Sequence, residues 1–235
     1  MAERDRVRIW SWLVALIPLV MVLLLAYGAH REIEQFSRGA LRANTLAAAS
    51  SYVEVLERFR TLYTSEVVNR LPLDKIRVVH NYSELDNAIP LPATLTKMLL
   101  TEQATVEVRL YSNHPFPWRR AGHSLDKFEW LALSALRNDP GRPFYRFVRK
   151  GEELQLRYAK ADLMRAECVD CHNRHPDTPK DNWKVGDVRG VLEIIISMDD
   201  LQNSYHATSR RLLLLGLLGS VVVLASQILW LRLTR

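Results

Sequence analysis

The chain has 235 residues, of which 32 are Lys or Arg and 26 are Asp or Glu, giving a formal net charge of +6 at pH 7. The positive charge is spread along the chain without a basic run, so we expect no nucleic-acid binding. Only two residues, Cys168 and Cys171, are cysteines, which excludes a disulfide-rich scaffold.

Two apolar stretches are long enough to cross a membrane. The first covers residues 9–28 and spans roughly 30 Å as a helix, which matches a bilayer core. It is longer than the apolar region of a usual signal peptide, and Ala26-Tyr27-Gly28 is a poor cleavage site, so we expect an uncleaved anchor. The second stretch covers residues 212–231. Residues 1–8 would then form a cytoplasmic tail and residues 232–235 a cytoplasmic stub.

Residues 29–71 are expected to form a long helix that continues from the first membrane segment. The stretch lacks proline until Pro72, and its apolar side chains recur at three- and four-residue steps. The stripe comprises Leu46, Ala49, Val53, Leu56, Phe59, Tyr63 and Val67. It either packs on the chain's own domain or forms a homodimer seam that carries motion to the membrane, and periodicity alone leaves both options open.

Residues 72–208 are expected to form the main domain. The patterns predict a short helix over 93–102, a strand over 106–110 and a helix over 125–137 capped by Ser124. A hairpin follows, with strands over 144–149 and 154–160 around residues 150–152, and then a loop over 162–186, a strand over 188–198 and a helix from Asp199. Antiparallel strands with helices gathered on one side indicate an α+β class. We expect a PAS-like antiparallel sheet domain with a long N-terminal helix, flanked by two transmembrane helices.

The segment Cys168-Val169-Asp170-Cys171-His172 is the strongest chemical signal in the chain. Two cysteines at this spacing, followed at once by histidine, form the attachment signature of a c-type haem. Each thiol would add across one haem vinyl group, and His172 would then bind the iron as proximal ligand. Attachment of this kind takes place outside the cytoplasmic membrane. We therefore expect one covalent haem c and a periplasmic main domain in a two-pass protein of the inner membrane.

Three other interpretations of the motif are weaker. A zinc site would need four ligands, and a cramped set of Cys168, Cys171, His172 and His175 is the only local option. A thioredoxin-like dithiol would lie in a βαβ unit, which the surrounding pattern does not predict. A disulfide would leave His172 without a role.

The sixth iron ligand is open to several residues. The candidates are His175, His114, His80, His123 and Met164. His175 is too close in sequence, because three residues span at most roughly 10–11 Å, less than two ligands on opposite haem faces require. We favour His114, which ends a predicted strand before a rigid Pro-Phe-Pro segment. An open sixth position is the alternative, and gas sensing would require one.

Several further residues could form the haem pocket. Trp183 is expected to supply an apolar wall and Arg189 to pair with a haem propionate. Arg119, Arg157 and Lys184 are additional candidates for the propionates, although a solvated surface role is the ordinary alternative for each.

The sequence resembles a family of membrane-anchored c-type haem sensor domains with a PAS-like fold, long catalogued as a domain of unknown function. The resemblance lies in residues 110–119, 157–161, 168–176 and 183–193, and with the two apolar flanks it covers most of the chain. Such modules often precede bacterial adenylate or guanylate cyclases and histidine kinases. This sequence ends at Arg235, so the resemblance implies a truncated or split sensor, or action through a cytoplasmic signalling partner.

Two functions therefore compete. One is a redox or gas sensor that transmits a change at the haem through its flanking helices. The other is a membrane-anchored monohaem cytochrome that exchanges electrons with a donor and an acceptor. An enzyme is not expected, because no acid–base set stands beside the motif. The family resemblance favours the sensor, although fold-level analogy alone is a weak argument.

Overall fold

The computed structural model describes the backbone of residues 2–99, 105–120 and 124–233. Side chains are described for the same residues except 2–16, 19, 200–202, 206 and 231. The chain divides into two compact units, of which one comprises residues 44–199 and the other residues 1–43 together with 200–235. The expected α+β class, with a long N-terminal helix and an antiparallel sheet, is confirmed.

Helix α1 runs from Ala2 to Leu62 and continues as a π-helical segment, η1, over Tyr63–Val67. A 3-10 turn, η2, over Val68–Arg70 then ends the helical run just before Pro72, as the sequence predicted. Ala49, Val53 and Leu56 of the predicted stripe are buried within the unit 44–199. The stripe therefore packs on the chain's own domain, which was the first of the two options.

The last part of the predicted stripe is wrong. Phe59 and Tyr63 are only half-buried and Val67 is exposed. The buried positions are instead Arg60, Thr64 and Val68, which follow Leu56 at four-residue steps. Two of these three are polar, so a search for apolar periodicity passed over them.

The segment between η2 and the sheet forms a small substructure. Strands β1 (Arg77–Val79) and β2 (Ala88–Pro90) pair in parallel, with a 3-10 turn, η3, over Tyr82–Glu84 between them. Helix α2 follows over Pro92–Met98, so the predicted helix is present, and residues 100–102 of its predicted range lie outside the described residues. Proline is favoured at the first helical turn, because its missing N–H has no intrahelical acceptor there.

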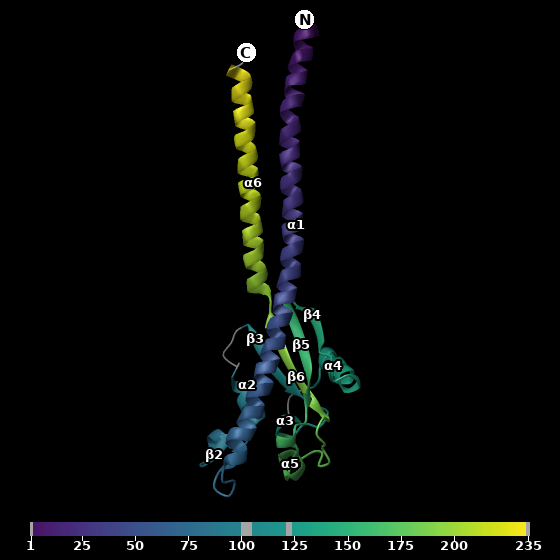
Figure 1. Cartoon of the computed structure of the whole chain (residues 1–235), viewed down its shortest axis with the longest axis vertical. Helices are drawn as coiled ribbons and strands as arrows, with labels where there is room; N and C mark the ends of the chain where they lie inside the picture. The colour runs from purple at the N-terminus through teal and green to yellow at the C-terminus, as the bar shows by residue number, and fades with distance from the viewer. Residues whose placement is uncertain (1, 100–104, 121–123, 234–235) are drawn as a thin grey trace. The chain divides into compact units, whose positions relative to one another are not determined.

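The main sheet has four antiparallel strands in the order β3-β6-β5-β4 (Figure 1). Their bounds are Val106–Tyr111 for β3, Phe144–Lys150 for β4, Glu153–Leu163 for β5 and Val188–Ser197 for β6. The predicted hairpin is confirmed as β4 and β5, joined through Gly151, whose φ of 65° favours glycine. Gly190 of β6 is needed because a Cβ there would collide with the carbonyl oxygen of Tyr111.

Helices cover both faces of this sheet, which corrects the expectation that they gather on one side. Ala159 and Ala161 of β5 face α4 (Lys127–Asn138) and join its core cluster. Tyr158 and Lys160, the alternate residues of β5, contact Ser50 and Glu57 of α1 instead. Since both faces are buried, the central strand β6 carries an almost continuous apolar run rather than an alternating pattern.

Asp126, and not Ser124, caps helix α4. The Asp126 carboxylate accepts a hydrogen bond from the Glu129 backbone N–H at 2.9 Å, and the Glu129 carboxylate accepts one from the Asp126 N–H at 2.9 Å. This reciprocal pair is a capping box, which satisfies two N–H groups that have no intrahelical partner. The sequence analysis named Ser124 alone, and the Glu three residues beyond Asp126 is the local signal that it passed over.

Helix α6 runs from Asp199 to Leu233, and within it residues 203–230 are long and apolar enough to cross a membrane, with a mean hydropathy of 2.4. This supports the second expected span by length and composition. The first expected span, residues 9–28, is helical as part of α1, but many of its side chains lie outside the described residues. Within the unit 1–43 plus 200–235, His30 Nδ1 and Ser209 Oγ lie 2.9 Å apart and join the two helices.

Candidate functional site

The cysteine motif lies on a helix, where a loop was expected. Helix α5 covers Ala166–Arg174, at the same end of the sheet as the short helix α3 (Pro117–Arg120) (Figure 1). Residues three and four positions apart share one face of an α-helix. Cys168, Cys171 and His172 are related in this way, so the fold presents both thiols and the imidazole together.

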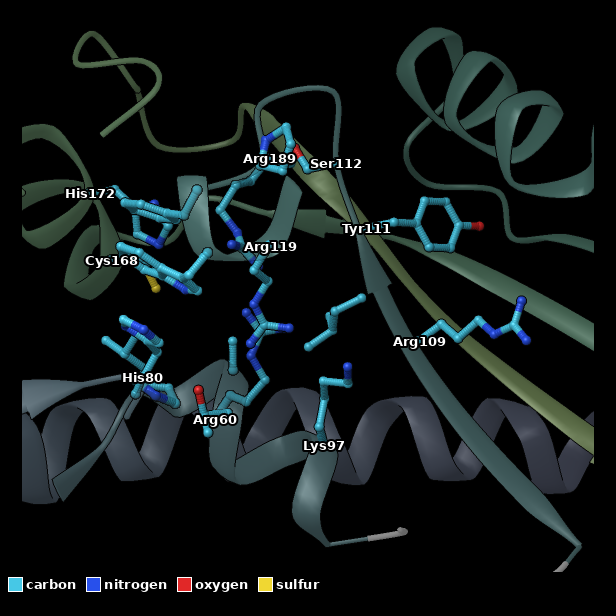
Figure 2. A pocket seen from close by; sticks show the side chains of 18 of the residues that line it. Arg60, His80, Lys97, Arg109, Tyr111, Ser112, Arg119, Cys168, His172 and Arg189 are labelled. Atoms are coloured by element: carbon cyan, nitrogen blue, oxygen red, sulfur yellow. The ribbon is translucent and has the colours of Figure 1, made fainter. Parts of the chain in front are cut away.

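This face of α5 borders a cavity of about 1560 Å³ (Figure 2). Typical small-molecule sites in proteins measure about 300–1,000 Å³, so the cavity has room for a ligand as large as a porphyrin. Its walls come from the end of α1 with η1 and η2, from β3, from α2, from α3 and from α5. The lining residues used below are Arg60, Thr64, His80, Lys97, His114, Phe116, Trp118, Arg119, Cys168, Cys171, His172, His175 and Arg189.

Aromatic rings form the wall next to His172. The Phe116 ring lies 5.5 Å from the His172 ring and 5.1 Å from the His175 ring, measured between centroids. Trp118 stacks on Phe116 at 4.7 Å and on His80 at 4.4 Å. The two prolines that flank Phe116 restrict the backbone here. The result is a flat apolar surface, which suits an aromatic macrocycle.

His172 is held in its neutral form. Burial, and after it the positive charges of Arg189 and Arg60, lower the pKa of His172 to about 3. At neutral pH the imidazole therefore carries no proton on one ring nitrogen. That neutral form is the one that binds a metal ion.

A buried ion-pair cluster lies behind the cavity wall. The Arg60 guanidinium donates two hydrogen bonds to the Asp162 carboxylate, at 2.9 and 3.1 Å. Arg189 Nε donates to the same carboxylate at 3.0 Å, and Arg189 Nη2 also contacts it. Burial alone would raise the pKa of Asp162, but the charges of Arg189 and Arg60 hold it well below its ordinary value. The cluster joins α1, β5 and β6 at one point.

The other interpretations of the motif can be compared with the structure. Within the described residues, no three His, Cys, Asp or Glu side chains form a group that could hold a metal ion. Both cysteines are free thiols. Although Cys171 is exposed as a residue, desolvation and the charges of Cys168 and Asp170 raise the pKa of its thiol. A redox dithiol would instead need a lowered pKa.

The candidates for a sixth ligand lie in different places. His114 lines the cavity and contacts the Trp183 ring edge-on at 5.7 Å, and burial lowers its pKa. His80 and His175 also line the cavity, and His175 Nδ1 accepts a hydrogen bond from the Asp177 N–H. Met164 is fully buried and is not among the lining residues. His123 lies outside the described residues.

The two expected pocket residues differ in their placement. Arg189 lines the cavity and pairs with Asp162. Trp183 is buried behind α5, where the Asn173 side chain bonds to its backbone N–H and carbonyl at 2.9 and 3.1 Å. Trp183 therefore fixes helix α5 against the following loop and does not border the cavity.

Of the other proposed propionate partners, only Arg119 borders the cavity. Arg157 lies on the opposite, α4-facing side of the sheet, where it bonds to Glu193 and Asp126. Lys184 is exposed and bonds through its backbone to Asp187. Neither residue borders the cavity, because the alternation of β5 and the loop after α5 point these side chains elsewhere.

Sequence reasoning missed Arg60 and Asp162. They are separated by 102 residues, so their pairing depends on the tertiary fold. Each carried a local signal, since Arg60 follows Leu56 by one helical turn on the buried stripe, and Asp162 interrupts the apolar end of a strand. A charged residue on a buried face generally needs a partner.

Taken together, the fold and the site define a mixed α+β domain in which one helix presents two thiols and a neutral imidazole to a large aromatic-walled cavity. The model of the Tll0287-like family matches residues 38–197, which is more than half of the chain. The chain belongs to the Tll0287-like family. No curated protein and no solved structure matched it.

Proposed function

We propose that the chain is a membrane-anchored protein that carries one covalent haem c in an extracytoplasmic PAS-like domain. The observation that carries this proposal is the common face of Cys168, Cys171 and His172 on α5, which borders the cavity. Two thiols at this spacing suit thioether bonds to one porphyrin, and the neutral imidazole of His172 suits the iron.

The cavity fits a haem in chemistry as well as in size. Phe116 and Trp118 supply an apolar wall for the porphyrin. The cations around the cavity suit the carboxylates of such a group, and His114, His80 and His175 are within the lining. When bound, the haem would supply a one-electron redox centre or a site for a diatomic gas. We keep His114 as the proposed sixth ligand.

Within this proposal we favour a redox or gas sensor in signal transduction over an electron carrier. Helix α5 packs against η1, the π-helical segment of α1. Such segments are rare and occur frequently at functional sites. Arg60, one turn before η1, is bound to Asp162 beside the same cavity. A change at the iron would thus act directly on the helix that leads towards residues 1–43.

The remaining assignments complete the proposal. Residues 9–28 and 212–231 would be the two membrane spans, in the inner membrane, with the domain in the periplasm, and the apolar stretch 203–230 supports the second of them. Exposed Val55 and Leu62 on α1 leave room for a homodimer contact through this helix, although the main stripe is already buried in the monomer. A cytoplasmic signalling partner would receive the output. The alternative remains a monohaem electron-transfer subunit with its own donor and acceptor.

The test of haem binding is direct. The full chain, produced with a functional cytochrome c maturation system, should carry haem that survives denaturing electrophoresis and stains for peroxidase activity. Its reduced absorption spectrum should be that of a haem with two thioether bonds. Absence of covalent haem under these conditions would refute the proposal.

The test of sensing compares the oxidised and reduced protein by hydrogen exchange. Exchange of backbone amides over residues 56–70 and 199–211 should change severalfold on reduction or on NO binding, because a signal requires two states with different helix contacts. Residues 127–138 of α4, on the other face of the sheet, serve as the internal control. Rapid reduction and reoxidation with unchanged exchange over 56–70 would favour the electron carrier.

A further inference from the structure

Two donor groups at the cavity have no acceptor within the described residues. Arg60 Nε is buried and makes no hydrogen bond, although both terminal nitrogens of this side chain are bound to Asp162. The Arg119 guanidinium has neither an ion pair nor a hydrogen bond in the described part of the chain. A buried donor without an acceptor destabilises the folded state by about 1–3 kcal/mol. We therefore expect a group bound in the cavity to supply the missing acceptor.

Three guanidinium groups gather around these two donors. Burial and the positive charges of Arg189 and Arg60 lower the pKa of Arg119, which shows that the three guanidinium groups influence one another. Figure 2 shows Arg189, Arg119 and Arg60 following one another along the cavity, beside Cys168 and His172. The carboxylate at this cluster is that of Asp162, which already pairs with Arg60 and Arg189. Arg119 therefore adds a positive charge that Asp162 does not neutralise.

The backbone that carries Arg119 is held in place. It lies on α3, and its backbone N–H bonds to the Phe116 carbonyl at 2.8 Å. Trp118, its neighbour, is held in a stack between Phe116 and His80. The guanidinium of Arg119 thus extends from a held backbone, and its planar fork loses less entropy per hydrogen bond than a lysine ammonium would.

We propose that Arg119 and the Nε of Arg60 form a carboxylate-binding subsite in the basic part of the cavity. A planar guanidinium matches a carboxylate with two parallel hydrogen bonds, and such charge-assisted pairs are the strong ones. The carboxylate can come from a propionate of the haem or from a small free carboxylate. The first source rests on the proposed function, whereas the second does not require a haem.

The first source agrees with the layout of the cavity. Thioether bonds to Cys168 and Cys171 would fix the vinyl-bearing part of a porphyrin at α5, and the propionates would then extend away from that helix. Arg60 and Arg119 belong to other walls of the same cavity, on α1 and α3. A propionate bound there would also lie next to the Arg60–Asp162 pair, and so next to the contact between α1 and the sheet.

The experiment uses the full chain with Cys168→Ser and Cys171→Ser, so that porphyrins bind reversibly. Iron protoporphyrin IX and its dimethyl ester, which lacks free carboxylates, are titrated and followed by absorbance. Iron protoporphyrin IX should bind about ten- to a hundredfold more tightly than the ester, the range expected for a charge-assisted hydrogen bond. Arg119→Gln should remove most of this preference and Arg119→Lys only part of it. Arg174→Gln, on the exposed side of α5, should leave it unchanged.

A second arm measures binding of succinate to the same haem-free protein by calorimetry, with and without Arg119→Gln. A preference for the free acid that depends on Arg119 identifies the propionate as the occupant. Succinate binding that depends on Arg119, without such a preference, identifies a free carboxylate. If Arg119→Gln changes neither measurement, the subsite is refuted. If no porphyrin binds to any variant, the haem proposal fails, and the succinate arm alone decides the subsite.

Discussion

Replacing Asp162 with asparagine is expected to destabilise the domain by about 3–5 kcal/mol, the usual cost of breaking a buried ion pair. Asp162 is 1% exposed and accepts hydrogen bonds from two arginines, of which Arg60 is also buried. The neutral amide would leave both guanidinium groups without a counter-charge. Urea unfolding of the full chain in detergent should show the midpoint falling by roughly 1–2 M.

A matched control separates this effect from an ordinary surface pair. Glu66 and Arg70 form an ion pair on the same helical run, with both side chains more than half exposed. Glu66→Gln should cost at most about 1 kcal/mol, because solvent screens such pairs. The combined replacement of Arg60, Asp162 and Arg189 by Met, Leu and Met should recover much of the loss, since no buried charge is then left unpaired. Equal, small effects of Asp162→Asn and Glu66→Gln would contradict the buried cluster.

The pH dependence follows from the same contacts. Because the arginines hold the folded-state pKa of Asp162 far below its unfolded value of about 3.9, the stabilising contribution is fully present above that value. As pH falls below about 4, the unfolded state takes up a proton that the folded state does not, so the contribution is progressively lost. Asp162→Asn should therefore flatten the acid limb of the stability profile. A profile identical to that of the wild type would contradict this assignment.

The sequence predicted the helices and strands better than it predicted which of their side chains are buried. The long helix, the hairpin and the last strand follow from periodicity and turn residues, which are local signals. Two errors arose where a polar side chain takes a buried position, as Arg60 and Thr64 do on α1. Their burial depends on β5 and on α5, which lie about a hundred residues further along the chain, and no local pattern encodes that.

At the candidate site, too, the local motif could be predicted from the sequence, whereas the tertiary contacts could not. The motif of Cys168, Cys171 and His172 is visible in the sequence because covalent chemistry demands a fixed spacing. Its placement on a helix was missed because α5 is short and polar on average. The partners of the arginines could not be predicted, since Arg119, Arg157 and Arg189 look alike in sequence. The fold alone puts Arg157 on the opposite side of the sheet, pairs Arg189 with Asp162 and leaves Arg119 facing the cavity.

The cluster at Asp162 also explains why a haem at this place could influence the helix. Arg60 belongs to α1, and its charge already affects His172, as the lowered pKa of that imidazole shows. A change in the charge of an iron bound to His172 would change the electrostatic energy of Arg60 in return, because the interaction is mutual. A buried position makes this coupling stronger than it would be in water.

The second large effect concerns attachment of the haem. Cys168→Ser combined with Cys171→Ser should remove all haem that survives denaturation, because these are the only cysteines in the chain and serine cannot form a thioether. The measurement is peroxidase staining after denaturing electrophoresis, together with the mass of the intact protein. Each single variant should keep at most one thioether bond, with the absorption of the reduced haem shifted towards that of a vinyl-bearing porphyrin.

Asp170→Asn is the matched control for the cysteine variants. Asp170 lies between the two cysteines in sequence, but it is exposed and pairs with Arg174 on the other side of α5. This substitution should leave covalent haem unchanged, because it alters neither a thiol nor His172. Full loss of covalent haem in Asp170→Asn would show that the maturation machinery reads the whole motif and not the shared face of α5. Haem that survives denaturation in the double cysteine variant would contradict thioether attachment at this helix.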